Sequence, residues 1–168
     1  VGKGICWWEN PGKVTAAWKC HTVGETPGYA DRFKIADING DGRNDIVVTE
    51  ERYPGLEPDA GLFWFENKGD AGGWERHLVM EQYSMNNLDC ADLDLDGDVD
   101  IVTAEHKGPR QTQVFENDGR GNFRVHRIDL GHESHIGTKL FDMDQDGDDD
   151  LVSAGWDEYR YLHLWRNE

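Results

Sequence analysis

Residues 91–106, ADLDLDGDVDIVTAEH, recur as ADINGDGRNDIVVTEE at 36–51 and as FDMDQDGDDDLVSAGW at 141–156, and the three segments align without gaps. Their first aspartates, Asp37, Asp92 and Asp142, lie 55 and 50 residues apart. A period of this length is typical of solenoids and propeller blades rather than of short motif arrays. The repeat therefore decides the architecture.

Each unit continues in the same order after its acidic segment. A β-branched run (46–49, 101–103, 151–153) precedes a polar stretch and a strand end in which an aromatic residue stands two positions before asparagine. In the first two units a glycine-rich turn and an alternating run follow. Four short strands per unit are typical of a propeller blade, and helical spacing is nearly absent. The sequence predicts an all-β fold, a β-propeller segment of four-stranded antiparallel blades.

The domain organisation follows from the phase of the repeat. We expect a single propeller segment, 1–168, that consists of a partial blade at 1–28, blades at 29–84 and 85–131, and a partial blade at 132–168. A closed propeller typically has four to eight blades. A free fragment would expose strand edges. We therefore expect the remaining blades of a longer chain, or a partner subunit, to complete the ring.

The acidic segments have the spacing of a hard-cation loop between strands 1 and 2. Carboxylate or amide oxygens stand at loop positions 1, 3, 5 and 9, glycine at position 6 allows the sharp turn, and position 7 would supply its carbonyl. Such cages suit Ca²⁺ better than Mg²⁺, so we expect three calcium ions. An EF-hand is disfavoured because position 12 is Val48, Thr103 or Ser153. The predicted ligands are Asp37, Asn39, Asp41, Arg43, Asp45, Asp92, Asp94, Asp96, Asp98, Asp100, Asp142, Asp144, Asp146, Asp148 and Asp150.

These loops, followed by β-branched strands, resemble FG-GAP or VCBS repeats. The resemblance implies the calcium-binding blades of integrin α-subunit propellers, fungal propeller lectins and many secreted bacterial proteins with polysaccharide-related roles. It covers nearly the whole chain. The Phe-Gly and Gly-Ala-Pro signatures of the integrin version are not found, so the bacterial VCBS type is the closer likeness. Because the blade is a reused scaffold, the resemblance does not fix the ligand.

Composition bounds the partners. The chain has 17 Lys plus Arg against 34 Asp plus Glu, a net charge of −17. This negative charge argues against nucleic acid or an anionic lipid surface as a binding partner. No apolar run is long enough to span a membrane. Weak-to-moderate oxygen cages suit extracellular calcium, so a secreted, periplasmic or cell-surface location is expected. Cys6 and Cys20 could face one another across a hairpin, but the sequence does not show a bond.

The face opposite the acidic loops collects non-repeating residues from the other connections. Mixed carboxylates, bases and aromatics suit a binding site for carbohydrate or another extracellular polymer, or for a protein ligand. The candidates are Glu50, Tyr53, Asn87, Glu105, His106, His135, Trp156 and Tyr159. Three alternatives stay open: solvated loops without a ligand, a lyase or hydrolase that uses Glu50 or Glu105 with His106, and a purely structural or assembly domain. The His132–His135 segment could instead bind a transition metal.

Two further sets of residues recur at fixed phases. The first set consists of aromatic residues, which we expect to pack between blades. Its members are Trp8, Phe65, Phe115 and Trp165, with Trp18, Trp74 and Phe123 at a second phase. The second set is His21, His77 and His126. One active site does not need three copies of a histidine, so a repeated structural hydrogen bond is predicted for them.

Overall fold

The computed structural model describes residues 4–69, 73–132, 136–156 and 162–168, and in these ranges it contains thirteen β-strands and no helix. All strand pairs are antiparallel, in two four-stranded sheets flanked by a hairpin and a three-stranded sheet. The predicted all-β fold is confirmed. The strands are β1 (Gly4–Glu9), β2 (Lys19–Glu25), β3 (Tyr29–Ala36), β4 (Asp45–Glu51), β5 (Ala60–Asn67), β6 (Trp74–Gln82), β7 (Met85–Ala91), β8 (Asp100–Glu105), β9 (Gln111–Asn117), β10 (Phe123–Leu130), β11 (Gly137–Phe141), β12 (Asp150–Ala154) and β13 (Leu162–Trp165).

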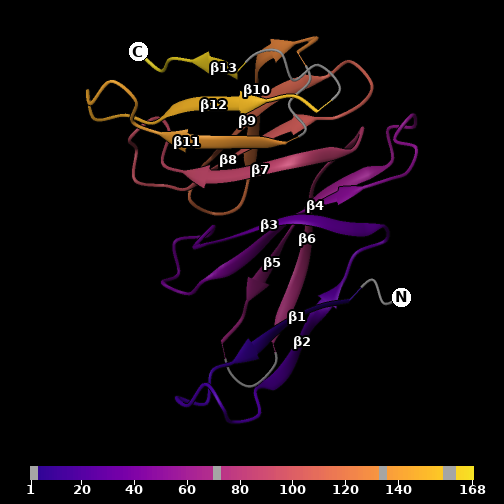
Figure 1. The fold of residues 1–168 in the computed structure, drawn as a ribbon. Coiled ribbons are helices and arrows are strands. Elements are labelled where there is room, and N and C mark those ends of the chain that lie inside the picture. The colour runs from indigo at the N-terminus through magenta and orange to yellow at the C-terminus, as the bar shows by residue number, and fades with distance from the viewer. Residues whose placement is uncertain (1–3, 70–72, 133–135, 157–161) are drawn as a thin grey trace.

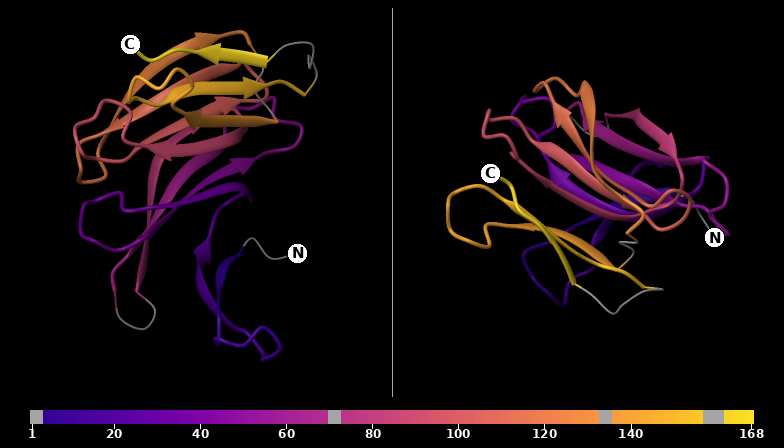
Figure 2. Two further views of the ribbon diagram at one scale, coloured as in Figure 1. Left: turned by 60° about the vertical axis from the view of Figure 1, so that its left-hand side comes forward. Right: turned by 90° about the horizontal axis from the view of Figure 1, so that it is seen from above.

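The sheets follow one another in chain order. The N-terminal hairpin (β1–β2) lies at one end, then the first blade (β3–β6), the second blade (β7–β10) and the C-terminal sheet (β11–β13) (Figure 1). Two further views show the sheets layered with their faces toward one another (Figure 2). Contacts between sheets are concentrated on the first strands, β3, β7 and β11. This arrangement is that of consecutive propeller blades, whose first strands surround the axis.

The core lies between the sheets. Strand β4 is buried along almost its whole length because it has a sheet on each side. Its side chains alternate: Ile46 and Val48 pack with Phe65 toward the hairpin, while Val47 packs against the second blade. This is why the strand sequence is a continuous apolar run rather than a half-polar alternation.

The repeated aromatic residues divide according to their neighbours. Phe65 and Phe115 are fully buried, because a preceding sheet covers each of them. Trp8, at the same phase in the hairpin, is exposed, and Trp165 is half-buried. Packing between blades is therefore confirmed for the two phenylalanines.

A buried carboxylate joins the three first strands. Asp89 of β7 forms an ion pair with Lys34 of β3, and its Oδ2 lies 3.3 Å from Nζ of Lys139 in β11. The backbone N–H of Leu140 donates to the same oxygen at 3.3 Å. Burial raises the pKa of Asp89, but the hydrogen bond from Lys34 and the charge of Lys139 outweigh it, so the pKa lies below its ordinary value. The ionised carboxylate thus stabilises the contact between blades.

No helix in the described part of the chain is long and apolar enough to cross a membrane.

Candidate metal centres and the opposite face

The three acidic loops connect β3 to β4, β7 to β8 and β11 to β12, and they share one hydrogen-bond pattern. The glycine at position 6 donates its N–H to the first aspartate of the loop. These bonds run from Gly42 to Asp37 at 2.7 Å, from Gly97 to Asp92 at 3.0 Å and from Gly147 to Asp142 at 3.2 Å. The aspartate at position 5 likewise accepts the N–H of position 7. The short side chains thus hold the backbone in a tight curl.

The backbone of the loops explains their glycines. Position 6 has a positive φ in all three loops, of 83°, 99° and 106°, as the sequence predicted. Position 4 also has a positive φ, and there only the first loop has a glycine, Gly40. Leu95 and Gln145 adopt the left-handed conformation with φ of 61° and 65°. Sequence reasoning missed this position because leucine and glutamine do not signal a turn.

The aspartate at position 9 connects the loop to the end of the third strand. Asp45, Asp100 and Asp150 are buried, and each uses both carboxylate oxygens. Oδ2 accepts the N–H of loop position 2 at 3.0–3.1 Å, and Oδ1 accepts the N–H of the strand-end asparagine at 2.8–3.0 Å. Burial raises the pKa of Asp45 and of Asp100, against the hydrogen bonds that lower it. A structural role of this aspartate was not predicted from the sequence.

The strand-end asparagine then binds the neighbouring blade. Asn117 Nδ2 donates to the carbonyl of Ile38 in the first loop at 2.7 Å, and Asn167 Nδ2 donates to Leu93 in the second loop at 2.9 Å. Asn67 Nδ2 instead reaches Asn44 in its own blade at 3.1 Å. Each acidic loop is therefore fixed both by its own aspartates and, in the first two cases, by the next sheet.

Carboxylate oxygens converge in the second and third loops. Ligand atoms of Asp92, Asp94 and Asp100 lie within 4.8 Å of one another, as do those of Asp142, Asp144 and Asp146. Asp92 Oδ1 is buried and accepts no hydrogen bond within the described residues. Loss of hydration raises the pKa of Asp94, and the carboxylates of Asp96, Glu116 and Asp92 raise it further. An all-oxygen donor set with this charge fits a hard divalent cation.

The loops differ in how much of their charge is already compensated. In the first, Asp41 is paired with Arg43. In the third, Arg166 Nη2 lies 2.5 Å from Asp144 Oδ2 and 3.5 Å from Asp146 Oδ2. The second loop has Asp98 at position 7, where the first has Arg43, and Glu116 stands where the third sheet has Arg166. The second loop therefore has the strongest uncompensated negative charge.

On the opposite face, three predicted ligand-binding residues are buried, contrary to the expectation of a solvent-facing site. Glu50 accepts hydrogen bonds from the N–H groups of Gly28 and of Gly61, the latter at 2.9 Å. Glu105 accepts the N–H of Gln111 at 2.9 Å, and burial raises its pKa. Asn87 accepts the N–H of Thr138 at 3.0 Å. These side chains hold connections between strands, because both glutamates stand at the ends of β4 and β8 rather than in loops.

The remaining candidates on this face are more accessible. Tyr53 is 94% exposed and Trp156 is exposed, while His106 is half-buried. Tyr53 lines a hollow of about 270 Å³, together with Tyr29, Arg52, residues 54–57 and Asp59. His135 and Tyr159 lie outside the described residues, as does most of the 132–135 segment.

The three repeated histidines make the predicted hydrogen bond. His21 Nε2 lies 2.9 Å from Glu9 Oε2, His77 Nε2 lies 2.9 Å from Glu66 Oε2, and His126 bonds Glu116 in the same way. Glu66, Glu75 and His77 are close enough to hold a metal, but Lys68 Nζ already lies 2.7 Å and 2.9 Å from the two carboxylates. The negative charge of this cluster is therefore already compensated by Lys68.

The cysteines are not joined. Cys6 and Cys20 are free and exposed on the hairpin, and Cys6 lies opposite Thr22 while Cys20 lies opposite Trp8. A hydrogen bond with Cys6 raises the pKa of Cys20. Cys90 is free as well, and burial raises the pKa of its thiol to about 12.

Comparison with known families agrees with this geometry. The sequence profile of the FG-GAP-like repeat matches the chain at residues 37–103 and again at 92–153. Each match begins at the first aspartate of an acidic loop and ends in the strand after the next loop. No curated protein matches the chain. The resemblance noted in the sequence is confirmed, and the chain belongs to the FG-GAP-like repeat family.

Proposed function

We propose that this chain is a calcium-stabilised propeller module that acts outside the cytoplasm, secreted, in a periplasm or at a cell surface. Each acidic loop binds one Ca²⁺ through the side chains at positions 1, 3 and 5, with position 9 and the carbonyl of position 7 completing the set. The observation that supports this most is the second loop, where three carboxylates converge and Asp92 Oδ1 is buried with no hydrogen-bond donor among the residues that the structure describes.

The bound ions would relieve the repulsion between the carboxylates of each loop, which the protein's own basic side chains do not fully compensate. Three Ca²⁺ ions would change the formal charge from −17 to −11. Each ion would tie the end of a first strand to the start of the second, in a loop whose position-9 aspartate also holds the third strand. A ligand that binds only the folded state adds about 2.7 kcal/mol of stability per site at a hundredfold excess over its dissociation constant.

The difference in compensation predicts an order of affinity. The second loop binds calcium most tightly, because no arginine among the described residues is paired with its carboxylates. In the first and third loops the ion must displace or accommodate Arg43 and Arg166. Replacement of either arginine by glutamine should therefore strengthen calcium binding at its own loop.

A titration of the calcium-free protein with CaCl₂, followed by calorimetry and by thermal melting, tests the proposal. Asp94→Ala removes the position-3 oxygen ligand of the second loop and should abolish the tightest binding phase, whereas an amide at this position would still offer an oxygen, as Asn39 does in the first loop. Glu81→Gln removes one negative charge from an exposed position of β6 and serves as the matched control. A tight phase that survives Asp94→Ala, or that is lost equally in both variants, would overturn the assignment to the second loop.

Carbohydrate binding by the opposite face is a second proposed function. It is supported by the hollow beside Tyr53, where Tyr29 and Tyr53 offer exposed rings and Arg52, Glu57 and Asp59 offer polar groups. Aromatic rings bind the apolar faces of sugars while polar groups bind hydroxyls. The lyase or hydrolase alternative has less support, because Glu105 is buried and bonded to Gln111.

A glycan array, followed by NMR titration of any sugar found, tests this second function. Tyr53→Ala should abolish binding, whereas Trp18→Ala, which removes an exposed aromatic ring from the hairpin, should leave it unchanged. Equal binding by both variants would place the sugar elsewhere.

We also propose that further blades, from the same polypeptide or from a partner, cover the face of β3. Phe33 is 69% exposed, whereas Leu88, which occupies the equivalent position in the second blade, is 3% exposed because the first blade covers it. Cross-linking of Phe33→Cys to a neighbouring blade would support this. A protein whose cysteine at position 33 stays fully reactive in the complete assembly would contradict it.

A further inference from the structure

The histidines that bond to glutamate also stack on tryptophan in the first two sheets. Trp7 lies directly opposite His21 in the strand register, and their rings are 4.2 Å apart and 6° from parallel. Trp64 lies opposite His77, with rings 4.4 Å apart and 19° from parallel. The glutamate fixes the imidazole from its edge, so that its face is free to stack. The same unit is thus built twice.

In the first blade this tryptophan fills the space between neighbouring sheets. Trp64 is buried within the core shared with the second blade, and an added Cβ on Gly121 would come within 2.5 Å of its ring. The indole therefore fills this part of the interface between the third strand of one blade and the third turn of the next.

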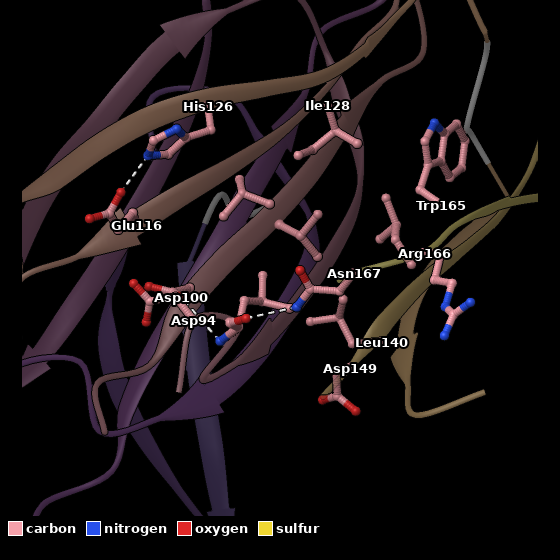
Figure 3. A pocket seen from close by; sticks show the side chains of 14 residues that line it. Asp94, Asp100, Glu116, His126, Ile128, Leu140, Asp149, Trp165, Arg166 and Asn167 are labelled. Atoms are coloured by element: carbon pink, nitrogen blue, oxygen red, sulfur yellow. Dashed lines mark hydrogen bonds and ion pairs between the residues drawn. The ribbon is translucent and has the colours of Figure 1, made fainter. Parts of the chain in front are cut away.

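The second blade lacks the tryptophan. Val114 stands at its position, opposite His126 in the same register. A cleft of about 340 Å³ lies at this place, between the second blade and the C-terminal sheet (Figure 3). Val102, Val114 and Ile128 line one wall, and Leu140, Leu151 and Trp165 line the other. The imidazole of His126 thus faces a cleft where the first blade provides an indole.

Acidic groups surround the apolar part of the cleft. Glu116 is bonded to His126, Asp94 lies farther along the cleft beside Asp100, and Asp149 lies on the side of the C-terminal sheet (Figure 3). The one arginine in the lining, Arg166, is paired with Asp144 at 2.5 Å. A bound molecule would therefore meet apolar and aromatic walls in the centre and negative charge at the edge.

We propose that this cleft binds a positively charged aromatic molecule, an arylalkylamine whose ring stacks on His126 and whose ammonium group lies beside Glu116. The ring would take the place that Trp64 occupies over His77. The acidic edge selects for a ligand with an ammonium group, because it would repel a carboxylate at the same position. The volume is within the range of small-molecule sites.

Tryptamine is the probe, with indole-3-acetate as the same ring bearing the opposite charge and n-propylamine as the amine without the ring. Binding is followed by NMR titration of the isotope-labelled protein in saturating calcium, so that empty metal loops do not affect the result. Tryptamine should bind at least about tenfold more tightly than either comparison compound, because ring and charge both contribute. Its shifts should centre on Val114, His126 and Trp165.

Val114→Trp is the decisive variant, because it rebuilds the stack of the first blade and fills the cleft. It should abolish tryptamine binding. Val125→Trp is the matched control, since Val125 pairs with Phe115 and does not line the cleft, and it should bind as the wild type does. Should Val114→Trp fail to fold, His126→Leu replaces it and should weaken binding at least about fivefold through loss of the stacking partner.

Three outcomes would overturn the proposal. Shifts that fall outside the cleft would place the amine elsewhere, and equal affinity for indole-3-acetate would exclude the acidic edge as the selecting feature. Undiminished binding by a folded Val114→Trp variant would show that the cleft is not the site. Retained calcium binding in the same samples would leave the proposed metal function standing, so that the two proposals fail separately.

Discussion

Replacement of Asn117 by alanine should destabilise the contact between the two complete blades. The side chain is buried, and its Nδ2 donates to Ile38 O at 2.7 Å in the first blade and to Val99 O at 3.0 Å in its own. Its Oδ1 accepts the N–H of Gly121 at 3.1 Å. Alanine removes all three hydrogen bonds and leaves the carbonyl of buried Ile38 without this donor.

The expected loss follows from these contacts. Three hydrogen bonds contribute about 1 kcal/mol each, and an unsatisfied buried carbonyl adds about 1 kcal/mol or more, so unfolding should become easier by about 3–5 kcal/mol. Asn67 is the internal control, because among the described residues its Nδ2 and Oδ1 bond Asn44 and Gly69, both in its own blade. Its replacement by alanine should cost about 1–2 kcal/mol.

Urea denaturation in saturating calcium, followed by circular dichroism and by tryptophan fluorescence, measures both variants. Asn117→Ala should lose more unfolding free energy than Asn67→Ala, with calcium binding unchanged at the third loop, which Asn117 does not contact. Equal losses in the two variants would refute the reasoning, because they would show that the bond to Ile38 does not contribute to the contact between blades.

Two further substitutions test the blade contact and the loop backbone. Asp89→Asn should lower stability at pH 7 by about 1–3 kcal/mol in chemical denaturation. Because the pKa of Asp89 is lowered in the folded state, that difference should be complete above the ordinary carboxyl pKa of about 4 and should be lost as the pH falls from there through the lower pKa of the folded state. A difference that does not depend on pH would show that the charge is not responsible. Leu95→Gly should raise the melting temperature and increase the unfolding free energy by about 0.5–1 kcal/mol, because glycine adopts the positive φ without strain and the leucine is exposed. A lowered melting temperature would contradict the assigned conformation.

The sequence allowed the blades to be predicted because their signals are local and repeated. The aspartates at fixed loop positions, the glycine at position 6 and the β-branched runs each recur in three segments. A structural hydrogen bond of His77 was predictable for the same reason, since the histidine recurs at one phase, although its partner, Glu66, was not. Features that follow from periodicity were therefore accessible without a structure.

Other features depend on which backbone groups meet in space. Glu50 and Glu105 follow β-branched runs and read as loop residues, yet the strands continue through them and backbone N–H groups from the next connection reach their carboxylates. The cleft beside His126 arises from one difference between the repeats. Val114 stands where Trp7 and Trp64 stand in the earlier sheets. Its size depends on how closely the C-terminal sheet approaches, which no local pattern encodes.

Native mass spectrometry of the chain in calcium buffer, before and after addition of a chelator, tests the central claim most directly. The account predicts a mass of the protein plus three calcium ions, with the ion of the second loop the last to be removed. A calcium-free mass in saturating calcium would contradict the account, because the converging aspartates would then be solvated charges and not a metal site.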